Sequence, residues 1–230
     1  MPTVILEHGL DSIGNDWEEV QDAVAQDTQV CFYSRAGMGF SGKPEEPVRT
    51  AQDAVDDLTL LLDAADLAGP YVLVGHSFGG FVVRLYADQH PDDVVGMVLV
   101  DTSHEEQFDR FQERLSAEAW AKMSQVLGDN AENMDLAGSG DEVSEAGGLG
   151  DLPLVVIGAE AEIVRAEDVG VSQAIVDEVN RVTNELAPEL QGELAKLSTN
   201  GELIIAEGSG HFVHQDRPDV VIDAILKVLP

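Results

Sequence analysis

Two hydrophobic patterns alternate along the chain. Short runs of consecutive apolar residues bounded by turn residues are typical of strands buried on both faces of a sheet. Between these runs, apolar residues recur every three or four positions, as they do in amphipathic helices. The runs predict strands at Thr3–Glu7, Gln29–Tyr33, Tyr71–Val74, Val94–Val100, Leu152–Ile157 and Glu202–Ala206. The periodic stretches predict helices over about residues 15–26, 50–67, 81–90, 170–198 and 218–228.

This alternation of strands and helices predicts an α/β fold. Buried strands separated by helices form a mostly parallel sheet with helices on both faces, here with about six strands. The sequence contains no internal repeat and no second hydrophobic core, so we expect residues 1–230 to form one domain. In open sheets of this kind, a ligand site is expected at the carboxyl ends of the strands.

The connection between the fourth and fifth predicted strands is longer than the others in this alternating pattern. After the strand Val94–Val100, residues 108–127 show an amphipathic helical pattern, and residues 128–150 are rich in Gly, Ala, Asp and Glu and predict a loop. Long insertions in compact domains are usually lids or mobile loops. We therefore predict a lid insertion at about residues 104–150.

The stretch Gly75–Gly80, with the sequence GHSFGG, lies between a predicted strand and a predicted helix. The pattern G-x-S-x-G in this context is typical of a nucleophile elbow, a turn so sharp that small residues are needed around the serine. The turn exposes the serine hydroxyl above the sheet and places the next N–H at a helix N-terminus, where negative charge is stabilised. Ser77 is therefore the predicted nucleophile.

Four segments at predicted strand ends together resemble the α/β-hydrolase superfamily, in particular its serine esterases and lipases. They occur in the family's order and are His8-Gly9, Arg35-x-Gly37-x-Gly39-x-Ser41, the Gly75–Gly79 elbow and Gly208-Ser209-Gly210-His211-Phe212. The resemblance covers nearly the whole chain and is more specific for the fold than for the substrate. It implies the chain order nucleophile, acid, histidine, with His211 as the general base that activates Ser77.

The resemblance leaves the acid of this triad open. The family usually places it a few residues past the strand Leu152–Ile157, where this chain has Ala161 followed by Glu162. A minority of members carry it directly after the strand that follows the elbow helix, and Asp101 stands there. We expect Asp101 to orient His211, with Glu162 as the alternative. Asp101 could instead be a turn residue that caps the next helix.

Two backbone N–H groups are expected to bind the negative charge that develops on the substrate. One belongs to Phe78, directly after the nucleophile, and the other to Leu10 in the first strand–helix loop, with Asp11 as the alternative. Arg35 is expected to brace the loops through an ion pair and not to contact the substrate.

The other histidines are interpreted as structural or peripheral. His8 is expected to orient its own loop, His76 to pack beside the nucleophile, and His104 to lie near the rim of the pocket. His90 and His214 have no glycine-rich context and are interpreted as surface residues.

The chain carries 44 acidic and 12 basic residues, a formal net charge of −32. Such a surface repels nucleic acid and anionic membranes, so neither is expected as a partner. It also repels itself in dilute buffer, a penalty that screening relieves at high ionic strength, and we interpret the composition as salt adaptation. The single cysteine, Cys31, lies in an apolar run and is expected in the core.

No pattern typical of a secretory signal and no apolar stretch of ~20 residues is visible, so a cytoplasmic location is expected. Clustered histidines and cysteines are also missing, so no metal or other cofactor is expected. The predicted function is a serine hydrolase that cleaves small carboxylic esters through an acyl-enzyme. A lactonase, an amidase or peptidase, a carbon–carbon bond hydrolase and a slow-turnover ligand sensor remain alternatives. The sequence does not indicate the oligomeric state.

Overall fold

A computed structural model describes residues 1–161 and 170–230 of the protein. Its centre is a parallel sheet of six strands in the order β2-β1-β3-β4-β5-β6. The strands are β1 (Thr3–Glu7), β2 (Val30–Phe32), β3 (Tyr71–His76), β4 (Val94–Val100), β5 (Leu154–Ala159) and β6 (Gly201–Ala206). The strand order reverses between β1 and β3. At such a switch point the loops leaving neighbouring strands turn to opposite faces and leave a crevice for a ligand.

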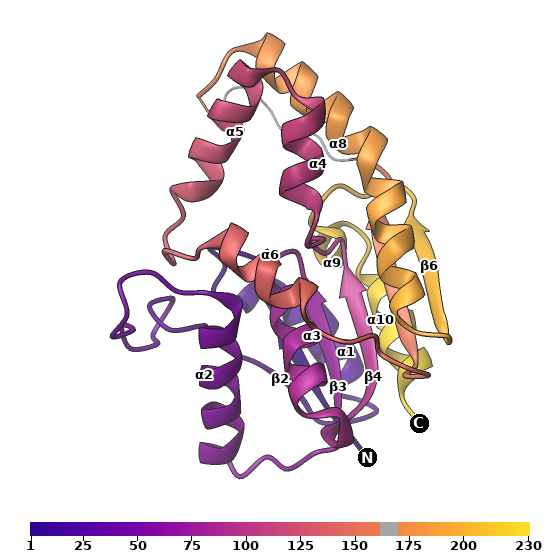
Figure 1. The fold of residues 1–230 in the computed structure, drawn as a ribbon. Helices are drawn as coiled ribbons and strands as arrows, with labels where there is room; N and C mark the ends of the chain where they lie inside the picture. The colour runs from indigo at the N-terminus through magenta and orange to yellow at the C-terminus, as the bar shows by residue number, and fades with distance from the viewer. Residues whose placement is uncertain (162–169) are drawn as a thin grey trace.

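Helices cover both faces of the sheet, so the predicted fold class is confirmed (Figure 1). Outside the predicted lid, the described residues form the helices α1 (Glu18–Val24), α2 (Ala51–Ala64), α3 (Gly79–Gln89), α8 (Gln173–Leu194), α9 (Val213–Asp216) and α10 (Pro218–Val228). Three short 3₁₀ turns adjoin these helices: η1 (Asn15–Trp17) before α1, η2 (Pro91–Asp93) after α3 and η3 (Ala195–Leu197) after α8. The two chain ends lie together at the end of the molecule away from α4 and α5 (Figure 1).

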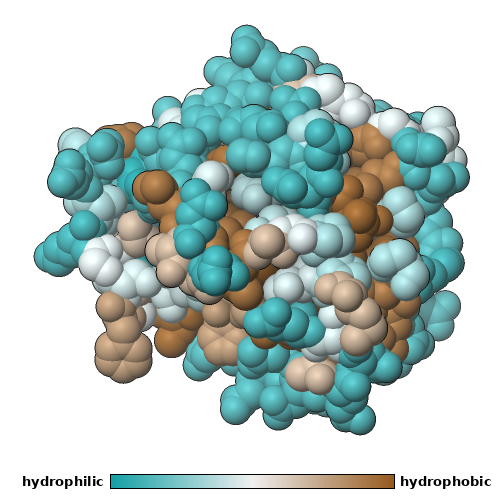
Figure 2. All heavy atoms as spheres, turned by 90° about the horizontal axis from the view of Figure 1, so that it is seen from below, coloured by the Kyte–Doolittle hydropathy of each residue, from teal (hydrophilic) through white to brown (hydrophobic). Residues whose placement is uncertain are grey.

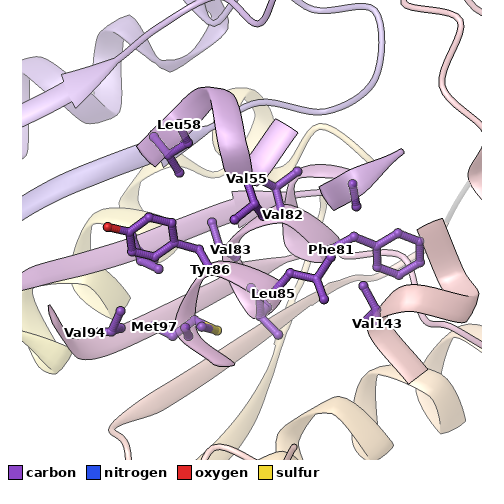
Figure 3. Packing of buried hydrophobic residues seen from close by; sticks show 14 of the residues in the cluster. Val55, Leu58, Phe81, Val82, Val83, Leu85, Tyr86, Val94, Met97 and Val143 are labelled. Atoms are coloured by element: carbon purple, nitrogen blue, oxygen red, sulfur yellow. The ribbon is translucent and has the colours of Figure 1, made fainter. Parts of the chain in front are cut away.

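Two hydrophobic clusters, one on each face, hold the sheet between its helices. Successive residues of a strand point to opposite faces, so Ile5 and Leu73 pack with α2 and α3, whereas Val4 and Val72 pack with α1 and α10. Figure 3 shows the first cluster, in which the ring of Phe81 extends from α3 toward Val143. Because α3 begins at the elbow, this packing fixes the element that carries the predicted nucleophile.

The segment predicted as a lid insertion, residues 104–150, contains three helices, α4 (Gln107–Arg114), α5 (Ala117–Gly128) and α6 (Leu136–Ser144). We keep the name lid for this segment. The pattern over 108–127 is thus two helices, because Ser116 starts α5 by accepting a hydrogen bond from the Ala119 N–H (3.2 Å). The prediction of a loop over 128–150 is wrong in part, since α6 lies within it. Helices α4 and α5 pack on α8, whereas α6 packs on α2 and α3 (Figure 1).

Hydrophilic residues occupy most of the outline of the face seen from below, with hydrophobic patches between them (Figure 2). The edge strand β6 exposes two apolar side chains, Leu203 and Ile205, by 36% and 43%.

Cys31, expected in the core, is half-buried because β2 is the opposite edge strand. None of the helices described is both long and apolar enough to cross a membrane.

Candidate active site

The elbow has the tight geometry that its glycines predict. Ser77 has a φ of 51°, in the left-handed region that side chains rarely adopt. A Cβ on Gly80 would lie 1.9 Å from the Thr102 methyl carbon, and one on Gly79 would lie 2.7 Å from the carbonyl oxygens of Glu7 and His8. Small residues are therefore needed because the end of β1 and the segment that follows β4 both pack against the start of α3.

Asp101 and His211 form the central polar contact of the site. His211 Nδ1 donates to Asp101 Oδ2 at 2.7 Å, and Asp101 Oδ1 accepts from the Ala159 N–H at 3.1 Å. The Asp101 N–H donates to the Ile157 carbonyl oxygen at 2.7 Å, so the next strand fixes both ends of this residue. The alternative acid, Glu162, lies outside the described residues.

The loop that carries His211 is braced from three sides. His76 Nε2 donates to the His211 carbonyl oxygen at 2.9 Å. The Gly208 N–H donates to Glu160 (2.7 Å) and the Gly210 N–H to Asp216 (2.8 Å). The His76 ring also lies 4.6 Å from the His211 ring, measured between centroids. His76 thus packs beside the nucleophile, as expected, and additionally holds the backbone of the histidine loop.

His214 was expected at the surface, and this expectation is wrong. Its ring is buried and stacks on Trp17 with 4.3 Å between centroids, while Nε2 lies 3.3 Å from Asp16 Oδ2. Burial favours the protonated form of Asp16, but its contacts with His214 and Ser12 outweigh burial and lower the pKa of this carboxyl group. Trp17 is buried because the start of α1 packs beneath the histidine loop, a contact between segments almost 200 residues apart.

The remaining histidines lie inside the structure to different degrees. His8 is fully buried, with Nδ1 donating to the Gly9 carbonyl oxygen (2.7 Å) and Nε2 accepting from the Arg35 N–H (3.2 Å). This pattern requires a neutral ring, and burial lowers the pKa of His8 accordingly. His104 is also buried, next to the cavity-lining Ser103, whereas His90 is half-buried against Tyr86.

Leu10 and Phe78 both line the cavity with N–H groups that donate no hydrogen bond to the part of the chain that is described. The Asp11 N–H, in contrast, is bound to Glu132 Oε1 at 2.7 Å. Of the two expected donors in the first loop, Leu10 therefore has the available N–H and Asp11 does not.

Arg35 braces the loops, as predicted. Its side chain is 2% exposed and donates to Glu7, to Glu132 and to the carbonyl oxygens of His8 and Gly9. Burial alone would lower the pKa of Arg35, but the negative charges of Glu7 and Glu132 outweigh it and raise the pKa above its ordinary value.

These residues surround a cavity of about 350 Å³ with two unlike sides. We call its sheet side the floor, formed by Leu10, Ser77, Phe78, Asp101 and His211. We call its opposite side the roof, formed by Phe108, Phe111, Leu127, Leu136 and Leu190. The floor carries Ser77, Asp101 and His211, and the five roof residues are apolar, although the polar Gln107 of α4 and Thr183 of α8 also line the cavity. No cluster of side chains suited to a metal ion occurs among residues 1–161 and 170–230.

Two residues of the site were not anticipated. Gln191 of α8 lines the cavity and donates from Nε2 to the Thr102 carbonyl oxygen at 2.8 Å, next to Asp101. Glu132 reaches the floor from the lid. Neither has a signal in the sequence, because glutamates are abundant throughout this chain and Gln191 lies in an ordinary helical pattern.

Comparison with known proteins agrees with this arrangement. The model of the alpha/beta hydrolase fold family matches residues 2–165. The chain belongs to this family. The uncharacterised protein YqjL of Bacillus subtilis is 29% identical over 229 residues, which cover 98% of this chain and 83% of YqjL. Several other curated relatives are much longer, and the chain spans only 15 to 18% of their length.

Solved structures share the alpha/beta hydrolase fold over essentially the whole chain. A thermophilic esterase from Thermogutta terrifontis superposes with a TM-score of 0.63 at 20% identity, covering 99% of this chain and 89% of the esterase. Est816, described as an N-acyl homoserine lactone degrading enzyme, superposes with a TM-score of 0.63 at 18% identity, covering 100% and 93%. At these identities the likeness concerns the fold.

Proposed function

We propose that this member of the alpha/beta hydrolase fold family is a serine hydrolase that cleaves small carboxylic esters through an acyl-enzyme. The observation that carries the proposal is the 2.7 Å hydrogen bond from His211 Nδ1 to Asp101, in the cavity that Ser77 also lines. A serine needs a base that is itself oriented by a third group, and this bond orients such a base.

Acylation begins with attack of Ser77 Oγ on the ester carbonyl carbon. His211 Nε2 takes the hydroxyl proton, and the carboxylate of Asp101 stabilises the imidazolium that results. The N–H groups of Phe78 and Leu10 bind the oxygen that becomes negative in the tetrahedral intermediate. When this intermediate collapses, the carbon–oxygen bond to the alcohol breaks and His211 returns the proton to the departing oxygen.

Deacylation repeats these steps with water in place of Ser77. His211 takes a proton from the water, the resulting hydroxide adds to the acyl carbon, and the bond to Ser77 Oγ breaks. Ser77 recovers its proton and the acid product leaves. Apart from the substrate and this water, every group in these steps belongs to the chain.

The cavity supports a small, uncharged substrate. Its volume fits a compact ester, and the apolar roof favours an aliphatic or aromatic portion above the scissile bond. A protein with a net charge of −32 repels anionic substrates, nucleic acid and anionic membranes at low ionic strength. The same charge supports salt adaptation as a further part of the proposal.

A lactonase is the second candidate, because a lactone is a cyclic ester that the same steps would open. The fold likeness to Est816 favours this candidate over an amidase or a carbon–carbon bond hydrolase. Steady hydrolysis of p-nitrophenyl esters without opening of acyl homoserine lactones would separate the two. A burst of one product equivalent without turnover would indicate a ligand sensor instead.

The proposal is tested by Ser77→Ala, with Ser103→Ala as the matched control. Both serines line the cavity, but only Ser77 lies at the elbow. We expect Ser77→Ala to abolish hydrolysis of p-nitrophenyl acetate and labelling by an organophosphonate, while Ser103→Ala retains both. Turnover above a few per cent of wild type in Ser77→Ala would overturn the mechanism.

A further inference from the structure

We propose that Glu132 is a positioning residue through which docking of the lid assembles the oxyanion site on the floor. The proposal rests on the serine hydrolase function proposed above. It concerns a residue of the segment between α5 and α6, which the sequence predicts as part of a loop.

Glu132 is an unusually buried charge for a lid residue. Its side chain is fully buried, and both carboxylate oxygens accept from Arg35, Oε2 from Nε and Oε1 from a terminal nitrogen, each at 2.7 Å. Arg35 also donates to Glu7 Oε1 at 2.5 Å. A buried carboxylate is tolerated where it is paired and hydrogen-bonded in this way. The lid therefore contributes one of the two carboxylates that compensate the charge of Arg35.

The same two residues fix both peptide groups that flank Leu10. Arg35 donates to the Gly9 carbonyl oxygen at 2.9 Å, and Glu132 accepts from the Asp11 N–H at 2.7 Å. In a planar trans peptide the N–H points opposite to the carbonyl oxygen. With the Gly9 carbonyl turned toward Arg35, the Leu10 N–H points away from Arg35. The Arg35–Glu132 pair thus sets the direction of one oxyanion donor.

The other expected donor lies in contact with the same pair. The Arg35 guanidinium carbon lies 5.4 Å from the centre of the Phe78 ring, within the range of a cation–π contact. The loop that Arg35 holds also packs directly on Gly79, the residue that follows Phe78. Arg35 consequently spans both sides of the oxyanion site, and Glu132 helps to hold Arg35 in place.

The lid segment around Glu132 is itself tied to the body of the protein. Asp11 Oδ1 accepts from the N–H groups of Ala131 (2.8 Å) and Glu132 (3.3 Å). Arg49 exchanges backbone hydrogen bonds with Asn133 (3.1 Å) and Asp135 (2.7 Å). Displacement of this segment would withdraw the carboxylate from Arg35 and from the Asp11 N–H at the same time. Docking of the lid and orientation of the Leu10 N–H are therefore one event.

The experiment compares Glu132→Gln with Glu142→Gln. Glu142 is a matched lid carboxylate, since it accepts from the Gln52 N–H (3.0 Å) and so also ties the lid to the body, but through α2 and not through the loop that carries Leu10. The amide in Glu132→Gln removes the charge and sets an N–H₂ group against the donors of Arg35. Complete loss of one oxyanion donor costs ~10²–10³ in kcat, so we expect a loss of ten-fold or more with KM within about two-fold of wild type.

Turnover is measured per active site titrated with an organophosphonate, so that misfolded protein does not count. We also expect the affinity for a boronic acid, which mimics the tetrahedral intermediate, to fall by a factor similar to that of kcat. Glu142→Gln is expected to retain both values. A Glu132→Gln enzyme with wild-type kcat per titrated site and wild-type boronate affinity would overturn the proposal, even if its melting temperature fell.

A second variant covers the case in which Glu132→Gln does not fold. Asp11→Gly removes the acceptor for the Ala131 and Glu132 N–H groups, leaves the Arg35 ion pairs intact, and suits the positive φ of 59° at this position. We expect a smaller loss of kcat in the same direction, and an unchanged kcat would contradict the proposal. Absence of ester turnover in the wild-type enzyme would instead refute the proposed function.

Discussion

The floor and the roof of the cavity are built on different principles. On the floor, hydrogen bonds hold the polar groups: Asp101 is fixed by both Ile157 and Ala159, and Asp101 in turn holds His211. On the roof, Phe111 and Leu190 belong to an apolar cluster that joins α4, α5 and α8. Directional bonds fix positions closely, whereas apolar packing tolerates changes of shape.

The difference indicates a division of labour. We expect the chemistry that depends on hydrogen-bond geometry to take place on the floor, where a small displacement would change the rate. We expect the roof to select among substrates, because its side chains can be exchanged while the reacting groups stay in place. Floor substitutions should therefore change kcat, and roof substitutions should change which ester is preferred.

Asp101→Asn is the strongest test on the floor. An amide can donate to His211 Nδ1 and so stabilise the wrong tautomer of the imidazole, and about 10⁴ in kcat is lost by this change in a well-studied Ser-His-Asp enzyme. We expect a loss of that order with little change in KM, measured with p-nitrophenyl acetate. The control is Glu162→Gln, the other acid expected from the sequence. If Glu162→Gln is the variant that loses kcat, Asp101 is not the triad acid.

Phe111→Ala tests the roof. Phe111 lines the main cavity and also a second cavity of about 160 Å³ between α5 and α8, so removal of the ring should connect the two. We expect the ratio of kcat/KM for an octanoate over an acetate ester to rise about ten-fold, since each buried methylene can contribute 1 kcal/mol or more. Leu115→Ala removes volume from the same cluster without lining either cavity, and should leave the ratio unchanged. An unchanged ratio in Phe111→Ala would show that the ring does not limit the acyl chain.

Acid should destabilise the protein, chiefly through the histidines beneath the floor. Burial lowers the pKa of His8 and His76 beneath the floor and of His104 next to Ser103, and lowers that of His76 furthest. Below pH 6.5 these histidines are protonated in the unfolded chain but stay neutral in the folded protein. The free energy of unfolding therefore falls as the pH falls. His76, whose pKa is lowered furthest, should contribute most to this loss of stability between pH 6.5 and 5.

Melting temperatures at pH 7 and pH 5 measure this effect. His76→Gln should reduce the difference between the two pH values, and His104→Gln should reduce it less. The lowered pKa values of Asp16 and Glu105 act below this range, because their contribution is lost only as the pH falls below about 4. Equal melting temperatures at pH 7 and pH 5 would contradict the expectation.

Salt should produce the smallest of these effects and should act on the whole surface. With 44 acidic and 12 basic residues, screening relieves repulsion, so the melting temperature should climb by several degrees from low salt to above 1 M NaCl. Against this rise, the exposed pairs of Arg110 with Glu106 and Glu189 at the roof should weaken, whereas the buried pairs of Arg35 should not. Sodium sulfate at matched ionic strength separates screening from enhanced hydrophobic burial. A flat NaCl series would remove the case for salt adaptation.

Much of the floor could be predicted from the sequence because its causes are local. The glycines of the elbow are needed because of steric contacts within a few residues of Ser77. A buried strand likewise ends where its run of apolar residues ends. The carboxyl ends of parallel strands then meet at one edge without further information. These rules predict the loops that carry Ser77, Asp101 and His211. They do not predict the order of the strands in the sheet, which only the structure shows.

The roof could not be predicted because its causes are distant in the sequence. Helix α6 contains two glycines and little helical periodicity, so propensity argues against it. It forms because Ser139 and Glu142 accept hydrogen bonds from the Ala51 and Gln52 N–H groups and because Val143 is buried against α3. In the same way, the burial of His214 depends on Trp17 and that of Glu132 on Arg35.

The open edge at β6 has a consequence for the protein in concentrated solution. A strand with unpaired backbone groups and exposed Leu203 and Ile205 is a template for pairing with the same strand of another molecule. In dilute buffer the long-range repulsion between two chains of charge −32 keeps these edges apart. High salt shortens the range of that repulsion to a few ångströms, so the salt that we expect to stabilise each molecule would also remove the barrier between molecules. The upper limit to useful salt is then set by colloidal stability, and β6 is where association would begin.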